Sequence, residues 1–414
     1  MTTKRTRRIG LFAVLSVVGP GVIAASAGND SGGISTYSVA GARYGYQMLW
    51  MMLIMTPAFV IIQEMAGRMG AVTGKGFSAL IRERFGLRPT FVAMVLLLAS
   101  AAATTVAEFA GVAAAMEMFG VSRYLSVPIA AVVVWLLVVR GSYRNVEKVL
   151  LALSSVFVAY IVSAFLAKPD WLEVGRALVV PSVTPTAGFV ALAIGLTGTT
   201  IAPWMQFLVQ SNIVDKGTSA AEWKLARWDV IAGALAANLV AMFIIITTAT
   251  VLHPAGVQIT DAAQAASALA PLAGEYATVL FAVGLLAASV LSAAVLPLTS
   301  AYATCEAFGW EAGIDRDWSE APVFNGLYTA VIVLAAAVIL LPGLDLIAIM
   351  LLSQVVNGMM LPFLLIFMMK IINDRRIMGS HINGTVHNVF AWGTIVVAIA
   401  LTAALMAMTV LGVS

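Results

Sequence analysis

Residues 19–45 read GPGVIAASAGNDSGGISTYSVAGARYG, and this stretch decides the fold. It follows an apolar run that begins at Ile9, but several glycines and Asp30 arrive together about where a spanning helix would reach mid-membrane. A carboxylate at the centre of a spanning helix costs at least about 2.5–3.5 kcal/mol on insertion scales, so an intramembrane acid indicates function. The glycines allow the helix to unwind, and unwound backbone at membrane depth is tolerated only inside protein or beside a water-filled cavity. The stretch therefore predicts half of an ion-binding site.

The composition is that of a polytopic membrane protein. Of the 414 residues, 61% are hydrophobic and 10% are charged, and the mean hydropathy is +0.98, which no soluble domain of this length approaches. The single cysteine, Cys305, excludes an intramolecular disulfide, and we interpret it as a packing residue. The net charge of +3 is spread over short loops, so nucleic-acid binding is not expected.

Enzymatic chemistry is not indicated. The three histidines, His253, His381 and His387, lie near predicted helix ends and show no metal-ligand spacing such as HExxH. The sequence also offers no paired nucleophile and base. The 20 methionines are scattered through apolar helices, so packing explains them better than copper binding does. We therefore expect neither an enzyme nor a resident cofactor.

Windows of about 20 apolar residues predict eleven spans in a single transmembrane domain, residues 1–414, embedded in the lipid bilayer. The expected limits are 10–42 (broken), 46–69, 90–118, 124–140, 147–167, 187–213 (broken), 228–252, 273–304, 322–341, 345–371 and 386–412. With a cytoplasmic N-terminus, nineteen of the 23 Lys and Arg residues lie inside, which is a strong positive-inside bias. We therefore expect a multi-pass protein of the cell (inner) membrane whose C-terminus is extracytoplasmic.

The N-terminus also has the basic start, apolar core and ASA-G end of a cleaved signal peptide. We interpret it instead as the first part of the first span. Cleavage near Ala27 would remove that span just before its polar break, and Pro20 and Gly21 lie inside the required apolar region.

The predicted sixth span repeats the irregularity of the first. Its sequence from 188 to 212, GFVALAIGLTGTTIAPWMQFLVQSN, begins apolar and is expected to break between Gly195 and Pro203. It resumes with the polar residues Gln206 and Gln210. Two interrupted spans in corresponding positions are the mark of an inverted-repeat transporter, because the two breaks then meet near the midplane.

The spacing of the two breaks predicts a 5+5 inverted repeat. Repeat one covers about 9–168 and repeat two about 186–372. With five helices in each repeat, the second enters the membrane from the opposite side. The eleventh helix, about 386–412, lies outside the repeats.

Four segments carry a resemblance to a known family. GPGVIAASAGNDSGGISTYSVAGARYGYQMLW (19–50), followed by QEMAGRMGAVTGKGFSALIRERFG (63–86), resembles the helix 1 to helix 2 region of the NRAMP divalent-metal transporters. GTTIAPWMQFLVQSN (198–212) resembles their sixth helix, and SQVVNGMMLPF (353–363) resembles their tenth. The resemblance implies an all-α LeuT-like fold with broken helices 1 and 6 and a divalent metal ion bound between them.

The departures from the family pattern concern the expected metal ligands. NRAMP proteins typically read Asp-Pro-Gly-Asn in helix 1, whereas residues 30–33 read DSGG, so the acid remains and Gly33 replaces the amide. Their sixth helix typically carries Met-Pro-His, whereas residues 202–204 read APW, so Ala202 replaces the thioether and Trp204 the histidine. This pair of changes resembles the NRAMP-related magnesium transporter (NRMT) branch.

The chemistry of these changes also favours magnesium. A thioether is a soft ligand that suits transition metals, whereas Mg²⁺ is hard, prefers octahedral oxygen ligands and dehydrates reluctantly. Gly33 and Ala202 leave space where the two side chains would lie. We therefore expect a wide pocket that holds a largely hydrated ion.

The expected protein ligands are oxygen atoms. Asp30 is expected to bind the ion directly or through water, together with oxygens of Thr199 or Thr200 and the amide of Gln354. Half-helix ends present free carbonyls to cations, so the Thr199 carbonyl is a further candidate. The threonines could equally bond within their own helix, and the assignment of Gln354 rests mostly on the resemblance. Asn357, three residues after Gln354, is a weaker candidate behind it.

A second intramembrane acid, Glu108, has three open interpretations: a proton carrier, a residue on the ion path, or a carboxyl group that burial keeps protonated. The resemblance implies that the family's proton route runs through acids of helix 3, the histidine of helix 6 and arginines of helix 9. Here Thr105 stands where an acid is usual, Trp204 cannot titrate, and the predicted ninth helix contains no arginine. The relay is thus expected to be absent. Glu64 is expected to pair with Arg68 at i+4.

The sequence therefore predicts a carrier that imports divalent cations, chiefly Mg²⁺ and also Mn²⁺, by alternating access without proton coupling. The alternative within transporters is a proton-coupled Mn²⁺ or Fe²⁺ importer. A cation channel is disfavoured because broken helices fit a carrier better than a ring-symmetric filter. An amino-acid carrier of the same fold is disfavoured because Asp30 would repel the substrate carboxylate.

Overall fold

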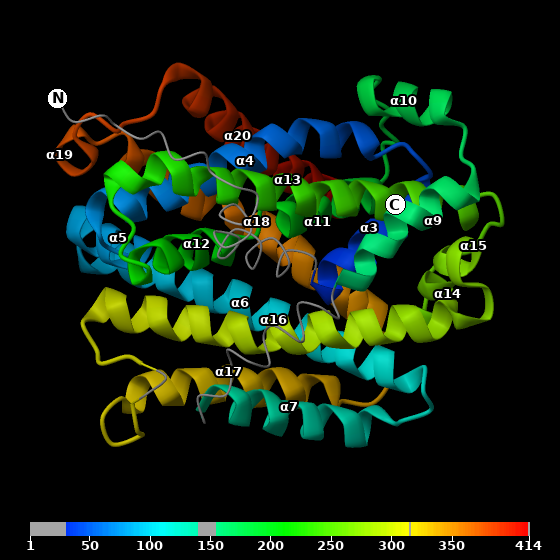
Figure 1. Ribbon diagram of the computed structural model, residues 1–414, viewed down its shortest axis with the longest axis horizontal. Coiled ribbons are helices and arrows are strands. Elements are labelled where there is room, and N and C mark those ends of the chain that lie inside the picture. The colour runs from blue at the N-terminus through cyan, green and yellow to red at the C-terminus, as the bar shows by residue number, and fades with distance from the viewer. Residues whose placement is uncertain (1–29, 140–154, 314–315, 413–414) are drawn as a thin grey trace, which may run out of the picture.

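Figure 1 shows the computed structural model, which describes residues 30–139, 155–313 and 316–412. In these ranges all regular secondary structure is helical. The helices are α3 (Ser31–Tyr44), α4 (Leu49–Thr73), α5 (Phe77–Phe85), α6 (Leu87–Glu117), α7 (Arg123–Val139), η1 (Ser155–Val158), α9 (Ala159–Ala167), α10 (Trp171–Val179), α11 (Ala187–Thr200), α12 (Pro203–Asp215), α13 (Ala220–Val251), α14 (Ala262–Ala266), η2 (Ser267–Leu269), α15 (Ala270–Ala273), η3 (Gly274–Tyr276), α16 (Ala277–Phe308), α17 (Pro322–Ile339), α18 (Leu346–Ile372), α19 (Arg375–Met378) and α20 (Thr385–Leu411).

The described part of each predicted span is helical, apart from a few residues at the span ends and the break at Ile201 and Ala202. Eight helical segments within the described ranges are long and apolar enough to cross a membrane, and α7 is a shorter apolar helix. The first part of predicted span one and residues 147–154 of predicted span five lie outside the described residues. The helical pair α11 and α12 forms the interrupted sixth span.

One helix begins earlier than its predicted span. α13 begins at Ala220 rather than 228 because a capping box fixes its start: Ser219 Oγ accepts from the Glu222 amide, and the Glu222 carboxylate accepts from the Ser219 amide. The loops also contain short helices, among them α5, α10, α14, α15 and α19. α10 starts after Asp170, whose carboxylate accepts from the backbone amides of Leu172 and Glu173.

The long helices run side by side and leave the short ones at the two ends of the bundle (Figure 1). We call these the α5 end, which carries α5 and α19, and the α10 end, which carries α10, α14 and α15. α6 packs along α16 and α18, α11 packs on α18, and α3 lies against α13, α18 and α11. α3, which belongs to predicted repeat one, therefore packs mainly among helices of predicted repeat two, and α6 of its own repeat also contacts it.

α11 and α18 approach each other at the level of their backbones. A Cβ added to Gly198 would overlap the Gln354 carbonyl and the Gly358 backbone, and one added to Gly358 would overlap the Ile194 carbonyl. Small residues permit such close packing between membrane helices. This contact fixes the last turns of α11 against Gln354 on α18.

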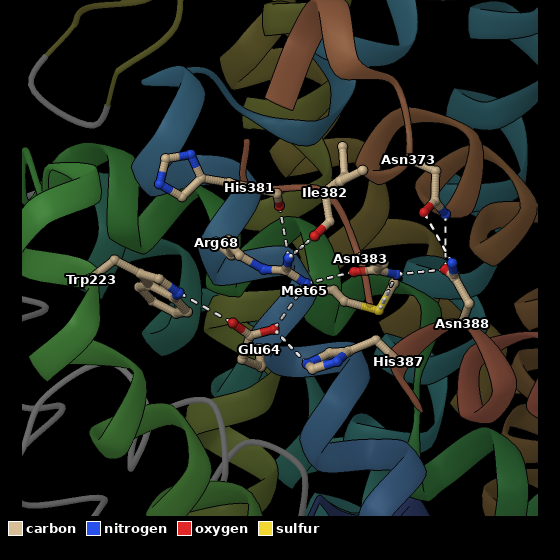
Figure 2. A network of polar contacts seen from close by, with 10 residues as sticks. All are labelled: Glu64, Met65, Arg68, Trp223, Asn373, His381, Ile382, Asn383, His387 and Asn388. Carbon is tan, nitrogen blue, oxygen red and sulfur yellow. Dashed lines mark hydrogen bonds and ion pairs between the residues drawn. The ribbon is translucent and has the colours of Figure 1, made fainter. Parts of the chain in front are cut away.

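A buried ion pair and its polar partners lie toward the α5 end, and Figure 2 shows them. Glu64 and Arg68 of α4 form the predicted ion pair, with 3.2 Å between Oε2 and Nη2. The other oxygen of Glu64 accepts from the indole of Trp223 at 3.2 Å, and His387 Nε2 lies 3.5 Å from Oε2. Oε1 of Glu64 is therefore hydrogen-bonded, and Oε2 lies in ion-pair contact with Arg68 and beside His387, without a hydrogen bond of its own among the described residues.

Arg68 also fastens the segment between α19 and α20 (Figure 2). Its guanidinium donates to the carbonyl oxygens of His381 at 2.8 Å and Ile382 at 3.2 Å, and to Asn383 Oδ1 at 2.6 Å. Charge-assisted bonds of this kind are stronger than neutral ones. Arg68 thus joins α4 to the start of α20, and we call this set of residues the Arg68 network.

Candidate functional site

Asp30 occupies the N-cap position of α3. Its backbone is extended, the helix begins at Ser31, and its carboxylate accepts a 2.5 Å hydrogen bond from the Gly33 amide. An aspartate is favoured at this position because it satisfies a free amide and complements the positive end of the helix dipole. The residue is only 3% exposed. The local sequence therefore holds one buried carboxylate at the start of a half-helix.

α6 brings a second carboxyl group to the same place. Glu108 Oε2 accepts from the Ser31 hydroxyl at 3.0 Å and from the Ser31 amide at 3.3 Å, and that hydroxyl also donates to the Ala107 carbonyl. The carboxyl groups of Glu108 and Asp30 lie beside each other. Two adjacent acids in a membrane interior repel each other when both are ionised, so the arrangement attracts a cation or a proton.

α18 contributes the amide of Gln354. The whole residue is buried, its nitrogen packs against Gly32, and its side chain lies beside Asp30. Its oxygen accepts a 3.1 Å hydrogen bond from Asn357 Nδ2. In this conformation Asn357 therefore occupies the amide oxygen, and the amide nitrogen lies beside Gly32 and Asp30.

The predicted break between Gly195 and Pro203 is narrower than expected. α11 continues through Thr200, and only Ile201 and Ala202 separate it from α12. Pro203 at the first position of α12 explains the end of α11, because proline starts helices well and cannot continue them. The glycines earlier in α11 serve its close packing on α18 rather than unwinding.

The end of α11 is tied to α3. Thr200 Oγ1 lies 3.2 Å from the hydroxyl oxygen of Tyr37. Tyr37 is buried, and its hydroxyl also lies beside Thr199 and Asp30. The last carbonyls of a helix have no partner within that helix, so the end of α11 presents oxygen atoms near the start of α3. Both threonines therefore lie in the same region as Asp30.

The remaining predicted residues lie around the α11–α12 junction and the start of α3. Gly33 is buried and its amide caps Asp30. Ala202 is buried, and its carbonyl accepts from the Met205 amide at 3.1 Å. Trp204 is fully buried within an apolar cluster that also contains Met205. An aromatic group that does not titrate thus occupies the place at which the resembled family has a titratable ring, and its indole N–H has no hydrogen-bond partner among the described residues.

Three buried atoms around Asp30 have no hydrogen-bond partner among the described residues, and we call them the orphan atoms. They are Gln354 Nε2, Glu108 Oε1 and Thr199 Oγ1. Buried polar atoms are nearly always paired because an unpaired one costs roughly 1–3 kcal/mol. Orphan atoms from three helices around one carboxylate indicate a place for a ligand or ordered water.

The sequence interpretation missed residues that complete this region. Tyr37 follows Asp30 by seven residues, so the two share a face of α3, and this spacing is visible in the sequence. Ser100 and Thr104 precede Glu108 at intervals of four, which places all three on one stripe of α6. A search for polar residues at helical spacing from each acid would have found them.

The donor set of the region is oxygen-rich. Carboxylates, hydroxyls and helix-end carbonyls surround Asp30, and these are the donors that hard divalent cations prefer. Within the residues that the structure describes, no group of three or more His, Cys, Asp and Glu residues could hold a metal ion. A centre here therefore combines few charges with neutral oxygens, which suits an ion that keeps part of its water shell.

A family model described as "Natural resistance-associated macrophage protein-like" (Nramp) matches residues 21–408. The chain belongs to the Nramp family. The divalent metal cation transporter MntH of Deinococcus radiodurans is 30% identical over 405 residues, which are 95% of this Nramp chain and 89% of that protein. The predicted family is therefore confirmed.

Solved structures show the same fold. A manganese transporter of Eremococcus coleocola is 22% identical, with coverage of 97% of this Nramp chain and 88% of that one and a TM-score of 0.76. MhsT in complex with L-phenylalanine is 15% identical. The match covers 98% of this Nramp chain and 99% of the MhsT chain, with a TM-score of 0.59. The all-α, LeuT-like architecture of this Nramp protein is thus confirmed.

Proposed function

We propose that this Nramp-family protein is a secondary carrier for divalent cations, chiefly Mg²⁺ and also Mn²⁺, that works by alternating access. The observation that carries the proposal is the convergence of two carboxyl groups and the orphan atoms at the junction of α3, α6, α11 and α18. The names of relatives with similar sequence and fold agree with metal transport. Its substrate is the metal ion itself.

The preference for Mg²⁺ rests on the hardness of the donors. The residue at the family's thioether position is Ala202, so the site offers oxygens rather than sulfur to the ion. Gly33 places no side chain beside Asp30 and contributes only its amide to the cap. A strongly hydrated ion such as Mg²⁺ keeps several waters in such a site and needs few protein ligands.

Transport is proposed to be uncoupled from protons. Thr105 donates its hydroxyl to Ala101 within α6, Trp204 lies in an apolar cluster, and α17 from Pro322 to Ile339 contains no basic residue. Among the described residues, Glu108 and Asp30 are then the carboxyl groups of the proposed path, and the cation occupies Asp30. The driving force is the ion gradient and the membrane potential, worth roughly 4.6 kcal/mol per 100 mV for a divalent ion.

The orientation follows from charge. The segment from Lys75 to Arg88 and residues 370–376 hold many of the basic residues, and both lie toward the α5 end. The positive-inside rule therefore makes the α5 end cytoplasmic in our proposal, with the C-terminus outside. Import is then movement from the α10 end toward the α5 end.

The test is uptake into proteoliposomes at a fixed membrane potential, with Mg²⁺, Mn²⁺, Ca²⁺ and Cd²⁺ compared at equal concentrations. The proposal predicts saturable uptake of Mg²⁺ and Mn²⁺ that exceeds that of the softer Cd²⁺. Uptake of Cd²⁺ and Mn²⁺ without Mg²⁺ would support the alternative, a transition-metal importer. Unitary currents in a planar bilayer would show a channel instead of a carrier.

A further inference from the structure

The orientation of the Gln354 amide has a consequence for ion binding, and this inference rests on the proposed function. Nε2, one of the orphan atoms, packs against Gly32 and lies beside Asp30, while Oε1 accepts from Asn357 at 3.1 Å. Ligands of hard cations are oxygen atoms. Gln354 therefore needs to turn its amide before it can bind the ion directly.

Asn357 is held by α6 through two hydroxyl groups. The Ser100 hydroxyl donates to Asn357 Oδ1 at 2.6 Å, and Asn357 Nδ2 donates to Thr104 Oγ1 at 2.8 Å. The Thr104 hydroxyl donates in turn to the Ser100 carbonyl at 2.9 Å. All of these residues are fully buried, so bulk water does not compete for their bonds. The direction of the Asn357 amide decides whether it hydrogen-bonds to the oxygen or to the nitrogen of the Gln354 amide.

Every member of this set can both donate and accept. A hydroxyl does so by rotation, and a primary amide does so by exchanging its oxygen and nitrogen through a half-turn. After such a turn of Asn357, its nitrogen donates to Ser100, and its oxygen accepts from Thr104 and from Gln354 Nε2. The Gln354 oxygen then faces a cation held beside Asp30, and Ser100, Thr104, Asn357 and Gln354 stay hydrogen-bonded to one another without any proton leaving or entering.

We propose that Asn357 is a positioning residue, and that Ser100, Thr104 and Asn357 form a reversible hydrogen-bond chain that turns the Gln354 amide. In one direction the chain presents the Gln354 nitrogen to the Asp30 carboxylate, and in the other it presents the oxygen to a divalent cation beside Asp30. Because α6 and α18 meet through this chain, ion binding is linked to the contact between these two helices.

The first test is a double-mutant cycle on Mg²⁺ uptake in proteoliposomes. Asn357→Leu is expected to raise KM about tenfold, the effect of one lost buried hydrogen bond, with a much smaller change in Vmax. In a Gln354→Leu background the same substitution is expected to change KM by less than about twofold, because Asn357 acts through Gln354. Additive effects in the two backgrounds would overturn the proposal.

A matched set of substitutions on α6 tests the hydrogen-bond chain without altering α18. Thr104→Val removes the hydroxyl at nearly constant volume and is expected to raise KM, whereas Thr104→Ser retains the hydroxyl and is expected to restore it. The control is Thr105→Val, since Thr105 is equally buried but donates only to Ala101 of its own helix at 2.7 Å. Equal increases in KM for Thr104→Val and Thr105→Val would contradict the proposed hydrogen-bond chain.

The reversal itself has a spectroscopic signature. Mg²⁺-induced infrared difference spectra should show a shifted side-chain carbonyl band that disappears in Gln354→Leu and weakens in Asn357→Leu. A wild-type protein that transports Mg²⁺ without this band would overturn the reversal while leaving the proposed function intact. A wild-type protein that transports neither Mg²⁺ nor Mn²⁺ would overturn the proposed function and the role of Gln354 together.

Discussion

The Arg68 network and the Asp30 region both bury charge, but they satisfy it in opposite ways. In the first, one oxygen of Glu64 is hydrogen-bonded and the other lies in an ion pair, and the guanidinium of Arg68 donates to three groups beyond that ion pair. In the second, two carboxyl groups lie together, and the orphan atoms surround them.

The difference separates structure from function. A buried pair of opposite charges in contact fixes one arrangement of the chain, and removing one partner exposes the full desolvation cost of the other. A cluster with unmade bonds gains little stability from its own contacts, and it becomes favourable when a cation binds. Substitutions in the two regions should therefore affect different measurements.

The largest effect on stability is expected from Arg68→Ala. It leaves the Glu64 carboxylate buried beside His387 without its main partner, and it frees the carbonyl oxygens that Arg68 binds. Removal of one partner from a buried pair costs about 3–5 kcal/mol. We expect the apparent Tm of the detergent-solubilised protein to fall by many degrees in a thermal-shift measurement.

The control for Arg68→Ala is Lys75→Ala. Lys75 Nζ and Glu83 Oε1 are 2.6 Å apart, but their side chains are 47% and 53% exposed. Exposed pairs contribute about 0–1 kcal/mol, so Tm should hardly change. If both variants lowered Tm equally, burial of the Arg68 network would not be the source of its stability.

A change in selectivity should follow when the missing family ligands are restored beside Asp30. Gly33→Asn combined with Ala202→Met adds an amide and a soft thioether and reduces the space for water. We expect the ratio of Cd²⁺ to Mg²⁺ uptake to rise by about tenfold or more, the effect of roughly 1.4 kcal/mol. An unchanged ratio in competition uptake would place selectivity elsewhere in the chain.

The smallest effect is expected in proton movement during Mg²⁺ uptake. Proteoliposomes that contain a pH-sensitive dye should show no acidification that tracks Mg²⁺ entry at a clamped potential, because Trp204 and Thr105 cannot carry protons. Glu108→Gln should then leave the dye signal unchanged. Acidification that follows metal entry and disappears in this variant would show that Glu108 sustains coupling, and uniport would have to be abandoned.

Much of the fold was predictable because its signals are local. Asp30 next to glycines marks the start of α3, and Pro203 marks the start of α12. The start of α13 was missed although Ser219 and Glu222 form a capping box that the sequence displays. The extent of the second break was misjudged because Gly195 and Gly198 serve contact with α18, which depends on a distant segment.

The site was predictable in its residue types but not in its bonding. Asp30, Glu108 and Gln354 stand out because they are polar residues in apolar spans. The direction of the Gln354 amide depends on Asn357, and the direction of Asn357 depends on hydroxyls of α6 that lie more than 250 positions away in the chain. No local pattern encodes such a register between helices.

The most direct test of the central claim, that the Asp30 region binds the transported ion, is the initial rate of Mg²⁺ uptake by Asp30→Ala, with Glu64→Gln as the control. Asp30→Ala should lose Mg²⁺ uptake while its Tm changes little, because the loss of the capping bond to Gly33 is offset by the removal of a buried carboxylate beside Glu108. Glu64→Gln should lower Tm and keep the wild-type KM. Uptake by Asp30→Ala at the wild-type rate would contradict the account.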